Sequence, residues 1–188
     1  MHIPLGILAA SGGGAAGAFE SIATATGTGS SATITFSSIP ATFQHLQIRA
    51  LASSTANTGN IREVSVQINS DTGTNYARHT LIGDGANAFA NASATRSNIN
   101  QQWCPDQSLG SNFFGAAIFD IVDYASTTKN KTLRLFAGGE QNNGSYERII
   151  LGSGLWQSTS AITSISFTID SGNFTAATRF ALYGIKGA

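Results

Sequence analysis

The chain has 188 residues with ten basic and ten acidic side chains, so its formal net charge is zero. Only 11% of the residues are charged, about half the usual share for a globular domain. Neutrality argues against a nucleic-acid partner, which needs a basic excess to displace counterions, and against a polybasic membrane-surface protein. A hydrophobic fraction of 41% is too high for a disordered chain. We therefore expect a folded domain that binds neither nucleic acid directly nor a membrane.

The first 18 residues differ in composition from the rest of the chain. Four aliphatic residues near the start, Ile3, Leu5, Ile7 and Leu8, precede a Ser, Gly and Ala run at 11–18. Glycine loses much backbone entropy on folding, whereas each buried aliphatic side chain contributes roughly 1.5–3 kcal/mol. The pattern predicts an extended arm over residues 1–18 that docks on a neighbouring subunit. Folding of the arm back onto its own domain is the alternative.

From residue 19 onward the hydrophobic pattern has period two, which is typical of strands. Residues 63–69 alternate strictly, and similar alternation recurs at 32–36, 44–49, 132–137, 162–169 and 180–185. Residues 113–124 are apolar enough for a central strand. Turn residues punctuate these runs at 69–73, 83–85, 141–144 and 170–173. About ten strands and no amphipathic helix predict an all-β fold, a jelly-roll-like antiparallel β-sandwich over residues 19–188.

Residues that could carry catalysis are scattered along the chain. His2, His45 and His79 show no metal-ligand spacing, and no Gly-x-Ser-x-Gly motif marks a nucleophile. The single cysteine, Cys104, excludes a disulfide framework within one chain. Its position beside Trp103 favours a buried small hydrophobe over a reactive thiol.

Acidic residues offer no clearer site. Asp120 and Asp123 flank an apolar strand three positions apart, hence on opposite faces, unlike the facing carboxylates of a glycosidase. Asp71 lies in a turn that is only faintly similar to a calcium loop and lacks the later Glu of an EF-hand. We therefore predict that the chain is not an enzyme, with no catalytic residue, no metal site and no cofactor.

Aromatic residues provide one binding hypothesis. Trp103, Tyr146 and Trp156, together with Tyr76 and Tyr124, could stack on sugars from sandwich loops, as in carbohydrate-binding modules. Trp156 follows an apolar run, which favours packing in the core or in an interface. Trp103, Tyr146 and Trp156 are therefore candidates for either a glycan site or an interface.

Five segments resemble those of one protein family. They read IPLGILAASGGG (3–14), FSSIPATFQHLQIR (36–49), NSDTGTNY (69–76), GLW (154–156) and FALYGIK (180–186). The chain resembles small virion structural proteins of tailed double-stranded DNA phages, especially those of cyanobacteria and marine bacteria. The resemblance spans nearly the whole chain and rests on fold-forming motifs. It implies a virion component that is assembled in the host cytoplasm, and it does not choose between head and tail.

The leading hypothesis is a capsid decoration (cement) protein that reinforces the head. It would act as a homotrimer that grips the major capsid protein, or other virion proteins, through the arm. Neutral copies do not repel one another, which suits dense packing on a symmetric lattice. The alternative is a tail or fibre-associated module that recognises cell-surface polysaccharide. A hydrolase is the weakest hypothesis, because no acid/base constellation is visible.

Overall fold

The computed structural model describes residues 17–140 and 147–187, and this part of the chain is almost entirely β-structure. It contains twelve strands and one short 3-10 helix, η1 (Gln107–Leu109). The strands are β1 (Phe19–Thr26), β2 (Thr33–Phe36), β3 (His45–Ala52), β4 (Ile61–Ile68), β5 (Tyr76–Gly83), β6 (Ala88–Arg96), β7 (Ile99–Pro105), β8 (Gly115–Ile121), β9 (Lys131–Gly139), β10 (Arg148–Trp156), β11 (Ile165–Ile169) and β12 (Arg179–Ile185). The prediction of an all-β sandwich is confirmed.

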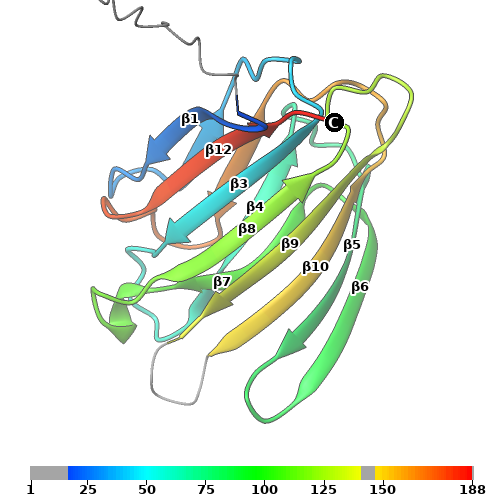
Figure 1. Cartoon of the computed structure of the whole chain (residues 1–188). Coiled ribbons are helices and arrows are strands. Elements are labelled where there is room, and N and C mark those ends of the chain that lie inside the picture. Colours follow the sequence, from blue (N-terminus) through cyan, green and yellow to red (C-terminus); the bar gives the residue numbers. More distant parts are fainter. Residues whose placement is uncertain (1–16, 141–146, 188) are drawn as a thin grey trace, which may run out of the picture.

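The strands form two antiparallel sheets (Figure 1). The larger has eight strands in the order β1-β12-β3-β8-β9-β10-β5-β6, and the smaller has four in the order β2-β11-β4-β7. Strands early in the chain pair with later ones: β1 with β12, β2 with β11, β3 with β8 and β4 with β7. A long hairpin rolled across two sheets gives this order, which is the jelly-roll topology. The hairpins β9–β10 and β5–β6 widen the larger sheet at one side.

The core lies between the two sheets. Phe167 of β11 packs against Phe119 of β8 and Phe180 of β12, with ring centroids 5.2 and 4.8 Å apart. Trp103 of β7 adds an edge-on contact with Phe119 at 6.2 Å. All four rings are buried. The period-two pattern also orients β4 correctly, because its three alternate aliphatic residues are each 1% exposed.

The apolar run at 113–124 is shorter as a strand than predicted. β8 covers only Gly115–Ile121, and the chain then turns so that Tyr124 enters the core. The Tyr124 hydroxyl donates a hydrogen bond to the carbonyl of Pro40. The apolar run in the sequence therefore extends to Tyr124 because this residue is buried after the chain turns. The run does not mean that the strand continues to Tyr124.

A buried carboxylate, Asp106, ties together the loops at one end of the sandwich. Its side chain accepts hydrogen bonds from the backbone amides of Thr58 (3.0 Å), Asn60 (3.2 Å) and Ser108 (3.1 Å). It also accepts from the hydroxyls of Thr58 and Ser108, and it lies 3.7 Å from Nε of Arg62. Burial alone would raise the pKa of Asp106, but these hydrogen bonds outweigh it and hold the pKa below its ordinary value.

A buried lysine organises the opposite connection. Lys131 is 1% exposed, and its Nζ donates to the carbonyls of Ser126 (2.8 Å), Lys129 (2.7 Å) and Thr159 (3.2 Å). Three acceptors match the three donors of an ammonium group, which makes its burial tolerable. Burial lowers the pKa of Lys131. The ammonium group of Lys131, at the start of β9, thus holds the polar connection that precedes this strand through hydrogen bonds to its carbonyls.

Candidate functional site

The aromatic residues singled out from the sequence lie in the interior. Trp103 is 0% and Trp156 is 3% exposed, and Tyr76 and Tyr124 are also buried. A sugar-stacking role for Trp103 and Trp156 does not fit this burial, because neither ring offers a face to a ligand. Both pack within the core of their own chain. Tyr146 lies outside the described residues, as do the arm residues Ile3, Leu5, Ile7 and Leu8.

The polar candidates are also placed apart. Asp120 accepts from Gln47 on the outer face of the large sheet, whereas Asp123 pairs with Lys129 beyond the end of β8. Cys104 is fully buried, and burial raises the pKa of its thiol. Within residues 17–140 and 147–187, no group of three His, Cys, Asp or Glu side chains could hold a metal ion. No helix in that part of the chain is long and apolar enough to cross a membrane.

The turn at Asp71, which is faintly similar to a calcium loop, is closed by its own hydrogen bonds. One carboxylate oxygen accepts from Trp156 Nε1 (2.7 Å) and Asn75 Nδ2 (2.9 Å), and the other accepts from the amide of Gly73 (2.8 Å). These bonds, that from Trp156 foremost, lower the pKa of Asp71 from 3.8. Both oxygens are engaged in fixing the turn and the buried indole.

This contact predicts acid sensitivity. The pKa of Asp71 is lower in the folded state than in the unfolded state. Its contribution to the free energy of unfolding is therefore present above pH 3.8 and is lost as the pH falls through the folded-state pKa. Thermal unfolding of Asp71→Asn should therefore show a shallower fall in Tm between about pH 5 and pH 2.5 than the wild type. Parallel Tm curves for the two proteins would show that Asp71 contributes nothing to the acid transition.

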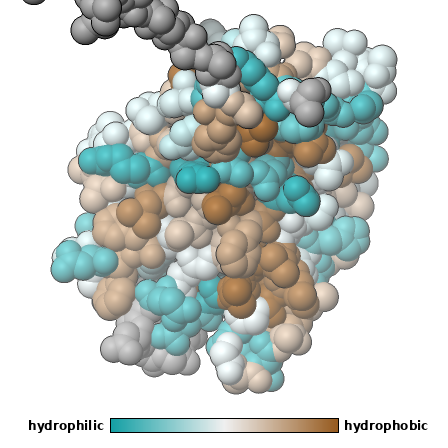
Figure 2. All heavy atoms as spheres, in the orientation of Figure 1, coloured by the Kyte–Doolittle hydropathy of each residue, from teal (hydrophilic) through white to brown (hydrophobic). Residues whose placement is uncertain are grey.

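An exposed apolar surface lies on the side of the eight-stranded sheet that faces away from the core, which we call the outer face. A row of large apolar side chains crosses four neighbouring strands there: Ile118 of β8, Phe136 of β9, Leu151 of β10 and Leu81 of β5. They are 37, 51, 53 and 49% exposed, respectively. Figure 2 shows hydrophobic side chains gathered on this face. The row continues onto β6, where Ala90 is the partner of Leu81.

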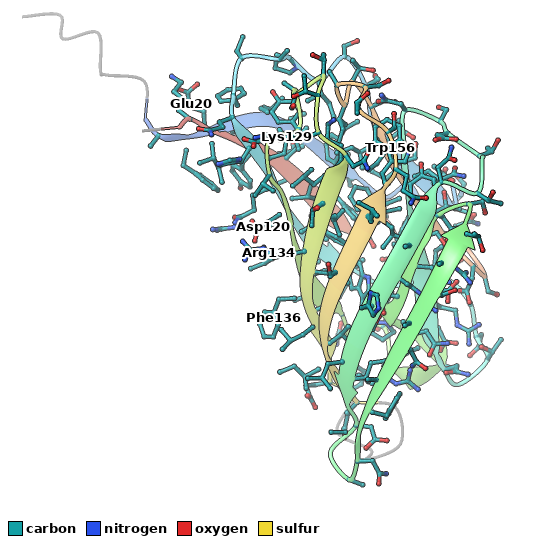
Figure 3. The ribbon with its side chains drawn as sticks, turned by 90° about the vertical axis from the view of Figure 1, so that its right-hand side faces the viewer. Glu20, Asp120, Lys129, Arg134, Phe136 and Trp156 are labelled. Carbon is teal, nitrogen blue, oxygen red and sulfur yellow. The ribbon has the colours of Figure 1, made fainter. Side chains whose placement is uncertain are left out.

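Two further rows flank this apolar row. On one side, Leu51 and Ile149 are 46 and 53% exposed and are separated by the small residues Ala116 and Gly138. On the other side the row is polar and contains Asp120 and Arg134, which project to the same side as Phe136 (Figure 3). The outer face is therefore apolar in two rows over β8, β9, β10 and β5 and polar in the third row. Arg49 of β3 is the neighbour of Ile118 and ends the first apolar row.

Two grooves in the outer face follow these rows of side chains. A groove of about 870 Å³ runs over β8, β9, β10, β5 and β6, with Leu81 and Leu151 in its lining. A second groove of about 570 Å³ lies over β8, β9 and β10 beside Ile149. Ile118 and Phe136 line both grooves and form the ridge between them. This shape can receive a ridged apolar surface better than a flat one.

The arrangement suits binding more than chemistry. A sheet with one face in the core normally turns a polar face to water, and contiguous exposed apolar patches mark interaction sites. Covering the exposed halves of Phe136, Leu151, Leu81 and Ile149 would stabilise a complex by about 1 kcal/mol each. The site that the structure brings together is therefore a candidate docking surface, and its residues differ from those expected from the sequence.

Comparison with known proteins identifies no protein similar to this chain. No protein-family model, curated protein or solved structure matches this chain.

Proposed function

We propose that this chain is a structural subunit of a tailed-phage virion, a decoration protein that reinforces the capsid. The observation that carries the proposal is the outer face, whose half-exposed Phe136, Leu151 and Leu81 need an apolar partner. The jelly-roll topology and the zero net charge support it, because they suit repeated packing on a lattice. The partner is the major capsid protein or another virion protein.

Attachment combines the outer face with the arm. The four half-exposed side chains of the outer face contribute about 4 kcal/mol on burial, and four buried aliphatics of the arm contribute roughly 6–12 kcal/mol. Loss of translational and rotational freedom costs about 4–15 kcal/mol. The outer face alone therefore gives weak binding, and stable attachment requires the arm. The proposed homotrimer would place three copies at one site on the symmetric shell.

Deletion of residues 1–17 tests the arm. The truncated protein should remain folded, because strand β1 begins after the deletion at Phe19. It should fail to decorate particles that lack the protein, whereas the full chain should bind them to saturation, as measured by sedimentation and gel densitometry. Full occupancy by the truncated protein would contradict the role of Ile3, Leu5, Ile7 and Leu8.

Copy number separates head from tail. A shell protein is present in roughly hundreds of copies per particle, as lattice symmetry requires, whereas a tail-tip protein is present in a dozen or fewer. Quantitative mass spectrometry of purified virions should therefore give a number that matches the capsid lattice. A count in the range of tail proteins would contradict decoration of the head.

A tail or fibre-associated carbohydrate-binding module is the second candidate, and the larger groove favours it. The polar margin of that groove places Gln47, His79, Asp120 and Arg134 near the half-exposed ring of Phe136. Hydrogen-bonding side chains beside one exposed aromatic ring are typical of sugar sites. A glycan array distinguishes the two candidates, because binding of a defined oligosaccharide would favour the tail module.

A further inference from the structure

The four open edges of the two sheets are protected to different degrees. β2 is only four residues long, and β1 carries a bulge and a Glu20–Lys186 ion pair of 2.6 Å. β7 has a register shift against β4 and ends at Pro105, and the guanidinium of Arg78 donates to its Asn100 carbonyl. Short strands, bulges, charges and proline all prevent edge-to-edge association. These three edges therefore resist pairing with another strand.

β6 lacks such protection over most of its length. It spans nine residues, none of them buried, and its only charged residue is the last, Arg96. Its pairing with β5 is regular from Ala88 to Ser93, and the register shift comes only beyond that point. An exposed, regular and uncharged edge strand is a template for pairing with a further strand.

The hairpin geometry identifies the free backbone groups of β6. The amide of Asp84 donates to the carbonyl of Asn87 at the hairpin end. Hydrogen-bonded pairs alternate along an antiparallel ladder, so the amides and carbonyls of Ala88, Ala90 and Ala92 point away from β5. No backbone hydrogen bond of the described residues outside the strand ladders engages these groups. Three donors and three acceptors thus lie in line along the open edge.

We propose that β6 pairs antiparallel with β6 of a second copy of this chain, about a two-fold axis near Ala90. Pairing Ala90 with Ala90, and Ala88 with Ala92, satisfies all of these outward groups in both copies. Side chains do not obstruct the approach of a second strand. The three residues whose backbone groups point away from β5 are alanines, and their side chains lie on the outer face. The chain has no net charge, so two copies do not repel each other.

The pairing would join the two large sheets into one. The apolar row that ends at Ala90 in one copy would continue into the row of the second, which doubles the width of the outer face. A second copy fits this edge better than an unrelated strand, because a two-fold axis makes the edge complementary to itself. The inference does not depend on the proposed function, since copies would pair whether or not a virion is present.

Analytical ultracentrifugation measures the mass of the full chain over a roughly hundred-fold range of concentration. The wide range is needed because a contact along a single strand edge is small, and small interfaces are weak. The wild type should approach two copies, or six if three-fold contacts also persist. Ala90→Pro removes an outward amide that β5 does not use, and Ala90→Lys places like charges opposite each other. Both variants should halve the limiting mass, and Asn91→Ala should not.

Amide hydrogen exchange supplies a second readout that does not depend on a variant. The amides of Ala88, Ala90 and Ala92 should become protected as the concentration rises, and this protection should disappear in Ala90→Lys. Circular dichroism and Tm establish that each variant is folded. A wild type that is monomeric or trimeric throughout, or association that survives both Ala90 variants, would overturn the proposal.

Discussion

Replacing Asp106 with Ala should lower the free energy of unfolding by about 3–5 kcal/mol, the cost of breaking a buried ion pair from one side. Three backbone amides, from Thr58, Asn60 and Ser108, would lose the buried carboxylate that accepts their hydrogen bonds. Each such unsatisfied group costs about 1–3 kcal/mol. Arg62, whose side chain is 12% exposed, would also lose its ion-pair partner.

Urea denaturation of the wild type and of the variant measures this loss. Asp84→Ala is the matched control, because Asp84 also accepts from two backbone amides, those of Ala86 and Asn87, but in an exposed turn. The control should change the midpoint far less than the Asp106 variant. A loss below about 1 kcal/mol at Asp106 would show that relaxation or water satisfies its donors, and would contradict its role as the tie between these loops.

Introducing carboxylates at the centre of the outer face should strongly weaken attachment to the particle. The double variant Phe136→Asp with Leu151→Asp removes two half-exposed apolar side chains and places two charges where the partner is apolar. Burying an unpaired charge costs several kcal/mol, and every 1.4 kcal/mol is a factor of ten in affinity. Affinity should therefore fall by more than about a hundred-fold, as measured by sedimentation with particles.

The control places the same two charges on the opposite sheet. Thr33 and Thr35 are exposed on β2, where their hydroxyls contact Thr168 and Ser166. Thr33→Asp with Thr35→Asp should bind particles as the wild type does. Equal loss of binding by both double variants would indicate a general effect of charge, and would contradict a specific role of the outer face.

Much of the fold could be predicted from the sequence because alternation records one buried face. β11, and β4 from Val64 onward, have apolar residues at every second position, and the structure buries those residues. β7 shows no such pattern, since Asn100 and Gln101 are buried beside its apolar residues. β6 also lacks the signal, because none of its residues is buried. Alternation therefore identifies strands that cover the core on one side and fails for the others.

The site was harder to predict. The indoles of Trp103 and Trp156 carry polar N–H groups and occur near turns, but hydropathy cannot show that the chain buries them. Asp106 was missed, although Asp is one of the residues preferred at a helix N-cap, the position that it occupies before η1. The burial of Lys131 has no sequence signal, because its three carbonyl partners come from two connections that only the fold brings together.

The sequence does contain a signal for the outer face. In β10 the residues Ile149, Ile150 and Leu151 are consecutive, and β8 is similarly continuous. A strand that is apolar on both faces is typical of a sheet covered on both sides. The described residues cover only one side of β8 and β10, which leaves Ile118, Ile149 and Leu151 partly exposed among those residues.

A density map of the purified virion, at a resolution that places β-sheets, tests the central claim most directly. The account predicts many copies of this jelly roll on the capsid, with the outer face against the shell and Phe136 and Leu151 covered by a partner. A particle in which the outer face is turned to solvent, and the four-stranded sheet contacts the shell, would contradict the account.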